Sequence, residues 1–478
     1  MRRFIALTFA LCIATFAAAE GIKAPKIIVG PYIQACSQSE FTVVWQTDCD
    51  AVSWVEVAPD DGTHFYNTAR EQFFHTVHGR RVVGRWHKVK VTGLDAGTPY
   101  RYRVLNKAVF LNPKNDRLYY SEGKGSDVYR RKPYLMRTLN DKAQTVRFAM
   151  GNDFHDKPEV LEQLFSKEII TPQNYDFVLY NGDMVSILAS EEQLVQSVIA
   201  PSVAQFATQV PLYVARGNHE TRGEHAAAFY DYFPTSTGQP YYTISHGGVF
   251  FIVLDGGEDK PDNDIEYYDL VRFDNYRKQE AEWLKDVVNS PECKNARARV
   301  VIIHIPPSSS GWHGEAEIAR LFIPILNSAN IDLMLCGHIH EYRFSEAGDA
   351  ICGSNFPIVC NPNRARMDVE VGTDKIVYKI TNANAEEFAR AECTGQKLKQ
   401  SCKNNNGKQR YCNLFCVVGK AVQITNGEVL RINNLFDGVA LVASAANGEA
   451  NAKHHNREDR SYTAKRNKTE SIVMSFSA

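Results

Sequence analysis

The chain has 478 residues, of which 54 are basic and 55 acidic, so its formal net charge is −1. This length allows two or three domains and at least one large buried core. A nearly neutral chain shows no sign of a polyanionic partner, which argues against binding to nucleic acid or to an anionic membrane surface. The apolar content of 44% is ordinary for a soluble globular protein.

Residues 1–19 have the pattern of a signal peptide. Arg2 and Arg3 precede an apolar run, and Ala17 and Ala19 supply the small residues of a signal-peptidase site. We therefore expect cleavage after Ala19 and export of a soluble protein to the periplasm or the extracellular space. A single membrane anchor is the alternative, but the run is shorter than the ~20 residues of a spanning helix. We expect no transmembrane segment after residue 19.

Ten cysteines follow the expected signal peptide, and an even number permits disulfides in an exported protein. Cys352 and Cys360 bracket a short segment and form the expected local pair, and Cys36 with Cys49 is a second. Cys336 lies inside an apolar run and is read as a small core residue.

Residues 25–137 predict an all-β sandwich. Their pattern is a series of aromatic or β-branched runs separated by turn residues, with no helical period. The runs are "FTVVWQT" (41–47), "SWVEVA" (53–58), "RWHKVKVTGL" (85–94) and "PYRYRVL" (99–105). The segment "GLDAGTPYRYRV" (93–104) resembles the closing strands of a fibronectin type III-like domain.

Residues 145–388 alternate between short apolar runs and segments of helical period, which predicts a layered α/β domain with a largely buried sheet. Helices are expected over 158–169, 191–207 and 277–288, and a last strand pair over 367–381. Residues 389–478 are polar and rich in asparagine, so we expect a partly disordered tail. Within it, the stretch 421–445 has the composition of strands.

Potential metal ligands follow five of the six apolar runs in this region. Because the carboxyl ends of strands form the ligand-binding edge of an open α/β sheet, these side chains should converge. Imidazole, carboxylate and amide ligands without a thiolate suit zinc, iron or manganese. Seven ligands are too many for one tetrahedral ion and fit two ions that share a carboxylate. The seven are Asp153, His155, Asp183, Asn218, His304, His338 and His340.

Five short blocks carry a resemblance to a known family. In order, "DFH" (153–155), "GDM" (182–184), "GNHE" (217–220), "HIPP" (304–307) and "GHIH" (337–340) match the signature of calcineurin-like metallophosphoesterases. With the β-rich region in front, the arrangement resembles purple acid phosphatases and their bacterial relatives. The implied fold is a layered metallophosphoesterase β-sandwich flanked by helices and preceded by the fibronectin type III-like sandwich.

The resemblance also implies how the ligands divide between two divalent ions. One ion would be held by Asp153, His155, Asp183 and His340, and the other by Asp183, Asn218, His304 and His338. Ser186 stands where purple phosphatases place a tyrosine whose metal-bound phenolate gives the colour. We therefore expect a colourless protein with two divalent ions, which would be zinc, manganese or iron.

The implied activity is hydrolysis of phosphomonoesters by attack of a hydroxide that bridges the two ions. His219 would protonate the leaving oxygen, and Glu220 would orient its imidazole; a purely structural histidine is the alternative. The loop 306–315 would reach over the ions and bring Trp312 or His313 to the substrate. A solvated surface loop is the alternative for that segment.

Two other functions are weighed against this one. The same site could act on a phosphodiester, a nucleotide or a phospholipid, because the surrounding loops rather than the metal ligands choose the substrate. A secreted binding protein with an inactive hydrolase domain belongs to a different class. That class predicts lost ligands, yet none of the seven positions is missing. The natural substrate and the oligomeric state are not encoded in any motif.

Overall fold

The computed structural model describes residues 23–112, 114–129 and 133–393, together with five short strands between residues 430 and 475. The chain divides into two compact units, residues 1–399 and residues 400–478. The expected signal peptide and most of the tail lie outside the described residues. None of the described helices combines the length and the apolar character that crossing a membrane requires.

The second unit contains two small antiparallel sheets. One pairs β23 (Leu430–Leu435) with β24 (Val439–Ala443). The other contains β25 (Glu449–Ala450), β26 (Thr463–Arg466) and β27 (Ile472–Ser475). The first pair falls in the stretch 421–445, where the composition had suggested strands.

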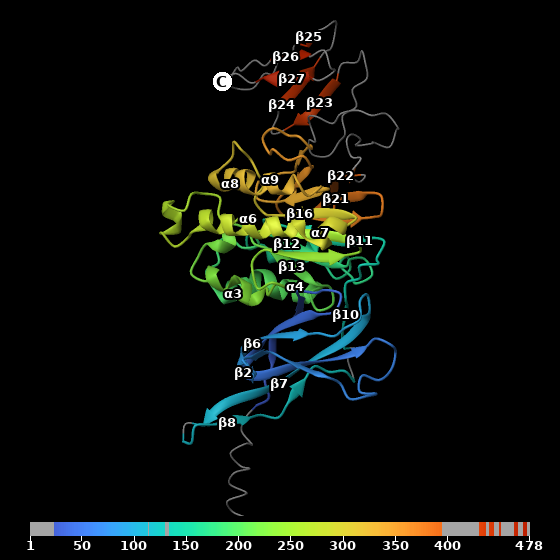
Figure 1. Ribbon diagram of the computed structural model, residues 1–478, viewed down its shortest axis with the longest axis vertical. Helices are drawn as coiled ribbons and strands as arrows, with labels where there is room; N and C mark the ends of the chain where they lie inside the picture. Colours follow the sequence, from blue (N-terminus) through green and yellow to red (C-terminus); the bar gives the residue numbers. More distant parts are fainter. Residues whose placement is uncertain are drawn as a thin grey trace, which may run out of the picture. The chain divides into compact units, whose positions relative to one another are not determined.

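The first part of the larger unit is all-β (Figure 1). Its longest strand, β2, pairs with β1 and β6 through its first half and with β3 and β7 through its second half. Trp45, on β2, is fully buried. The strands are β1 (Ile27–Gln34), β2 (Phe41–Pro59), β3 (Gln72–Phe74), β4 (Thr76–Val77), β5 (Arg80–Arg81), β6 (Val83–Val91), β7 (Pro99–Asn112), β8 (Arg117–Tyr120), β9 (Lys124–Gly125) and β10 (Tyr134–Arg137).

The hydroxyl of Tyr100 accepts a hydrogen bond from the backbone N–H of Asp95 at 2.9 Å. A tyrosine bonded to backbone a few residues upstream is also a feature of immunoglobulin-like sandwiches. The β-rich character of this region is confirmed, and its likeness to a fibronectin type III domain stays a prediction.

Two six-stranded sheets form the second part of the larger unit. The first sheet has the order β13-β12-β11-β20-β21-β22 and the second β14-β15-β16-β17-β19-β18. The first contains β11 (Val146–Gly151), β12 (Phe177–Asn181), β13 (Leu212–Ala215), β20 (Ala365–Val371), β21 (Ile376–Asn382) and β22 (Glu387–Cys393). The second contains β14 (Tyr242–His246), β15 (Val249–Val253), β16 (Ala298–Ile302), β17 (Leu333–Cys336), β18 (Arg343–Ser345) and β19 (Ile358–Cys360).

The main core lies between these two sheets. Alternate residues of a strand point to opposite faces, so Phe148 packs between the sheets while Ala149 packs among the helices on the outer face. Phe148 stacks on Phe177 with ring centroids 5.0 Å apart, and Phe251 of the other sheet meets Phe148 edge-on at 5.5 Å. Because both faces of each sheet are covered, the strands read as continuous apolar runs.

Helices cover the outer face of each sheet (Figure 1). The first outer layer contains α2 (Pro158–Leu164), α3 (Glu191–Leu194), the π-helical turn Val195–Ile199 and α4 (Ala200–Gln205), with α5 (Phe229–Tyr232) beside them. The second contains α6 (Phe273–Asn289), α7 (Pro291–Asn295), α8 (His313–Leu321) and α9 (Ile323–Leu326). The mixed, layered α/β fold expected from the sequence is confirmed.

The cysteine pairs expected from spacing are wrong. Of the cysteines in the described part of the chain, Cys36, Cys49, Cys293, Cys336, Cys352 and Cys360 have free thiols. Cys360 sits opposite Cys336 in the parallel pair β17–β19, whereas Cys352 belongs to the loop before β19. The short spacing from Cys352 to Cys360 therefore reflects a loop that returns into a strand. Cys336 is fully buried among apolar side chains, as its position in an apolar run predicted.

Candidate metal centre

The seven side chains proposed as ligands come together at one edge of the two sheets. Each of these side chains belongs to a residue that follows the carboxyl end of a strand, which is β11, β12, β13, β16 or β17. Ligand atoms within 4.8 Å of one another form three overlapping groups: Asp153, His155 and His340; His155, Asp183 and His219; and Asp183, His304 and His338. Asn218 joins the third group, because its Oδ1 lies 3.1 Å from Nδ1 of His338. Parallel strands have thus gathered residues that are far apart in the sequence.

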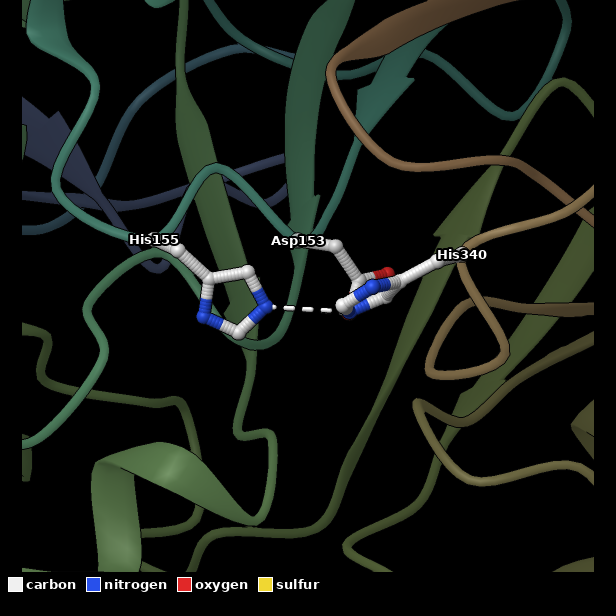
Figure 2. A group of neighbouring side chains, drawn as sticks. All are labelled: Asp153, His155 and His340. Carbon is white, nitrogen blue, oxygen red and sulfur yellow. Dashed lines mark hydrogen bonds and ion pairs between the residues drawn. The ribbon is translucent and has the colours of Figure 1, made fainter.

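The first group surrounds a common point. The Nε2 atoms of His155 and His340 face each other at 3.0 Å (Figure 2), and Oδ1 of Asp153 lies 3.2 Å from Nε2 of His340. Two nitrogens that each lie about 2.1 Å from one ion, at right angles, are about 3 Å apart. These separations are therefore those of ligands that share a metal ion.

The third group is built around His304 and Asp183. Nδ1 of His304 donates to the carbonyl oxygen of Asn181 at 2.6 Å, so Nε2 faces the carboxylate of Asp183. That Nε2 atom lies 3.0 Å from Oδ2 of Asp183. A hydrogen bond that fixes the tautomer of a histidine in this way is typical of a metal ligand.

Two buried polar atoms in the cluster, Oδ1 of Asp153 and Nε2 of His304, have ion-pair neighbours but make no hydrogen bond of normal geometry. An unpaired buried polar atom destabilises a fold by about 1–3 kcal/mol. A cation between these atoms would satisfy both. The donor set, with imidazole, carboxylate and amide oxygen, fits a divalent transition metal or zinc.

The backbone at the ligands adopts a conformation that non-glycine residues seldom take. The φ angles are positive at five ligands: Asp153 (55°), His155 (47°), Asp183 (55°), His338 (72°) and His340 (59°). Such left-handed residues are a few per cent of non-glycine positions and cluster at functional sites. The backbone is thus bent at each strand end so that the ligand turns toward the shared centre.

Asn152 holds the carboxylate of Asp153 in place. Its Nδ2 donates to Oδ2 of Asp153 at 2.6 Å and to the carbonyl of Asn361 at 3.0 Å, while Nδ2 of Asn361 donates back to Oδ1 of Asn152 at 2.7 Å. Both asparagines are fully buried. A Cβ at Gly337 would come within 2.9 Å of Nδ2 of Asn152, so only glycine leaves room for this pair. Sequence reasoning missed both asparagines.

A comparison with known families decides what kind of domain this is. Residues 146–342 match the family model described as calcineurin-like phosphoesterase. The chain carries a calcineurin-like phosphoesterase domain. That match spans all five ligand blocks.

Two curated relatives bear phosphatase names. "Probable purple acid phosphatase 20" from Arabidopsis thaliana is 24% identical over 264 residues, which cover 52% of this chain and 57% of that protein. "Serine/threonine-protein phosphatase CPPED1" from Mus musculus is 29% identical over 139 residues, or 28% of this chain and 42% of that protein. The chain spans about half the length of these relatives.

Among solved structures, the chain is similar to a conserved uncharacterized protein from Streptococcus pneumoniae TIGR4. The sequence identity is 11% and the TM-score is 0.27, and the match covers 53% of this chain and 99% of that one.

His219 lies at the margin of the phosphoesterase cluster. Its Nδ1 donates to the carbonyl oxygen of Ser186 at 2.5 Å, and its Nε2 lies 3.9 Å from Oδ2 of Asp183. The bond that orients this imidazole therefore comes from Ser186, where the sequence analysis expected Glu220. The motif contained no signal for this, because the partner is a backbone oxygen.

Glu220 instead binds backbone. Its buried carboxylate accepts hydrogen bonds from the N–H groups of Asp183, Met184, Val185 and Gly217, at 2.7–3.3 Å. Burial, followed by the nearby charge of Asp183, raises the pKa of Glu220. The carboxylate therefore shapes the turn that carries Asp183.

Opposite charges dominate the third ligand group, which contains Asp183 and His304. Burial alone would lower the pKa of His304, but the carboxylates of Asp183 and Asp153 outweigh it and raise that pKa to about 10. Burial opposes ionisation of Asp183 too, yet His304 and His219 hold its pKa below the usual range. A cation would take over the role of the His304 proton and would displace it.

The two residues proposed to touch substrate lie at the start of α8. Trp312 is 57% exposed, and Nζ of Lys260 lies 5.7 Å from the centre of its ring. Nε2 of His313 lies 2.7 Å from Oδ1 of Asp274, on α6. The structure therefore pairs His313 with the outer helix, and contact of either residue with substrate stays a prediction.

Proposed function

We propose that this protein is a metal-dependent phosphomonoesterase in which Asp183 is shared by two divalent ions. The observation that carries the proposal is the grouping of the ligand atoms. Two groups support the proposal, since each contains three of the four ligands expected for one ion: Asp153, His155 and His340 for the first ion, and Asp183, His304 and His338 for the second. Asp183 lies near both groups, since it also belongs with His155.

The chemistry supplied by two bound ions is charge stabilisation of the phosphoryl oxygens and activation of a water molecule. The protein's own residues hold those ions and handle the proton. His219, with Nδ1 fixed on Ser186, would present Nε2 to the leaving oxygen and protonate it. Its imidazole side chain is 28% exposed, which leaves it open to a substrate.

A phosphomonoester is the proposed substrate, and zinc, manganese or iron(II) the proposed ions. The name of the Arabidopsis relative, a purple acid phosphatase, supports this substrate class. Ser186 replaces the tyrosine expected of a purple enzyme, which supports a colourless divalent centre. We also propose that the protein is exported, because residues 1–19 have the pattern of a signal peptide.

Hydrolysis after metal removal tests the proposal. The purified protein would be stripped with a chelator and assayed on p-nitrophenyl phosphate and bis-p-nitrophenyl phosphate, before and after zinc, manganese or iron(II) is restored. We expect activity to return with metal and the monoester to be preferred. A preference for the diester would replace the substrate class but keep the metal centre. Loaded protein that is inert on both substrates would contradict the proposal.

A further inference from the structure

Large apolar side chains stand in solvent on the loops around the metal centre. Three lie between β15 and α6, where Ile265 is 87% exposed, Tyr268 80% and Leu270 84%. Trp312, before α8, is 57% exposed and Ile187, after β12, 47%. In the described part of 138–393 the one further exposed large apolar side chain is Ile351. We call Ile187, Ile265, Tyr268, Leu270 and Trp312 the apolar rim.

Contacts between neighbouring segments connect the rim from one end to the other. A Cβ on Gly223 would lie 3.2 Å from Cγ1 of Ile187, so Ile187 lies against the segment that contains Arg222. Arg222 in turn forms an ion pair with Glu266, the neighbour of Ile265, at 3.1 Å. Lys260 pairs with the same Glu266 and lies over the ring of Trp312. The rim is therefore one continuous surface.

This surface borders the metal centre. The residue before Ile187 is Ser186, whose carbonyl oxygen holds His219. Thr221 and Arg222 follow the ligand block 217–220. Both bind Glu258, which lies in the same segment between β15 and α6 as Ile265, Tyr268 and Leu270. A molecule bound on the rim would thus lie next to the ions.

Carboxylates separate the apolar side chains of the rim. The segment "LDGGEDKPDNDIEYYDLVR" (254–272) has seven acidic residues against one lysine and one arginine. Asp264 and Glu266 flank Ile265, and Asp269 stands between Tyr268 and Leu270. Inserting these apolar side chains into a lipid surface would also desolvate the carboxylates, which is strongly unfavourable. The rim is therefore poorly suited to a membrane.

Exposed aromatic and aliphatic side chains beside carboxylates fit a protein partner. Aromatic residues are enriched at the energetic centres of protein interfaces, and acidic side chains select a partner of the opposite charge. The larger α/β region has the same bias, with 37 acidic and 21 basic residues over 138–393. A polypeptide that binds the apolar rim should therefore carry both basic and apolar side chains.

We propose that the apolar rim binds a polypeptide segment with basic and apolar side chains and presents its phosphoserine to the metal centre. This inference rests on the proposed function. In the reaction, the oxygen of water bonds to phosphorus and the bond from phosphorus to the serine oxygen breaks. A proton passes to that oxygen, and inorganic phosphate and the serine peptide leave.

The test uses the full chain and two synthetic phosphoserine peptides that differ only in having lysine or glutamate beside their leucines. One variant combines Ile265→Ser with Leu270→Ser, and the control is Leu111→Ser, which changes an exposed leucine (55%) on β7. Peptide hydrolysis, binding of the unphosphorylated peptides by fluorescence anisotropy, and hydrolysis of p-nitrophenyl phosphate are measured. Binding does not require a working metal centre, so it reports on the rim alone.

We expect the lysine peptide to bind more tightly than the glutamate peptide. The rim variant should weaken that binding and raise KM by about tenfold, while kcat on p-nitrophenyl phosphate stays within about twofold. The control should behave as wild type. Rim-dependent binding without any hydrolysis would support the docking surface and defeat the proposed function. Equal binding of both peptides, or a rim variant that binds normally, would overturn the inference. So would rim-dependent binding to phosphatidylcholine vesicles in place of the peptide.

Discussion

The Nε2 atoms of His155 and His340 lie 3.0 Å apart, although 185 residues separate them in the sequence (Figure 2). Both follow the carboxyl ends of strands, β11 and β17, which belong to different sheets. Two ring nitrogens that face each other without a proton or a cation between them repel. A proton on one ring removes this repulsion, and so would the shared cation that we propose.

Replacing His340 with alanine should remove one ion and keep the other. The variant keeps Asp183, Asn218, His304 and His338, so metal analysis by mass spectrometry should find about one ion per chain. His225→Ala is the matched control, because that imidazole binds the hydroxyl of Tyr232 outside the cluster. A His340 variant that retains two ions would show that this histidine is not a ligand.

Asn152 should strengthen metal binding indirectly, through its hydrogen bond to the carboxylate of Asp153. Substitution to alanine removes the donor that fixes Oδ2 of Asp153, and loss of such a supporting bond typically weakens metal binding about 10–100-fold. Competition with a chromogenic chelator measures the change. The Asn361→Ala variant should follow it with a smaller loss, since Asn361 acts through Asn152. Unchanged affinity in both would refute a positioning role.

How much of this site the sequence predicts depends on whether a side chain or the backbone makes the contact. The convergence of the candidate ligands could be predicted because each of them follows an apolar run, and parallel strands bring such positions together. The roles of Ser186 and Glu220 could not be predicted in this way. Ser186 acts through its backbone carbonyl oxygen, and the carboxylate of Glu220 accepts hydrogen bonds from backbone amides. Hydrogen bonds to backbone leave no trace in residue type.

Element boundaries show the same limit. The helix expected over 191–207 is three consecutive helical segments ending at Gln205, with a π-helical turn before Ala200. Pro201 has no N–H to donate, so regular α-helical bonding is interrupted there. The helix expected over 158–169 ends at Leu164, whereas the strand pair expected over 367–381 appears as β20 and β21. Periodicity identifies an element, and local bonding decides where it stops.

His219 should matter most for substrates with a poor leaving group. An alkyl phosphate needs a proton on its leaving oxygen, whereas p-nitrophenolate leaves without one. His219→Ala should therefore lower kcat about 10²–10⁴-fold on an alkyl phosphate and far less on p-nitrophenyl phosphate. Steady-state kinetics on both substrates with metal-loaded protein measures the contrast. Equal losses on the two substrates would exclude proton transfer from this imidazole.

His87 should make the all-β region less stable in mild acid. Burial, with a smaller contribution from His75, lowers the pKa of His87 to about 3 from its ordinary 6.5. Below pH 6.5 the unfolded chain takes up a proton at this position that the folded chain excludes, so unfolding becomes easier as the pH falls. Between pH 7 and pH 5 this amounts to about 2 kcal/mol.

The His87→Gln variant removes this proton uptake. Urea unfolding at pH 7 and pH 5 should therefore show a smaller loss of unfolding free energy for the variant than for the wild type. Acidic residues titrate in both proteins and cancel in the difference. Identical pH dependence of the two proteins would show that His87 is not held neutral in the folded state.

Asp183 is the residue on which the account depends, because it lies within reach of both ligand groups. The most direct measurement is the metal content of purified wild type and Asp183→Asn, taken together with hydrolysis of p-nitrophenyl phosphate by the same samples. We predict about two ions per chain and metal-dependent hydrolysis for the wild type, and loss of both ions and of activity for the variant. A wild type with one ion, or an Asp183→Asn protein that keeps two ions and full activity, would contradict the shared metal centre.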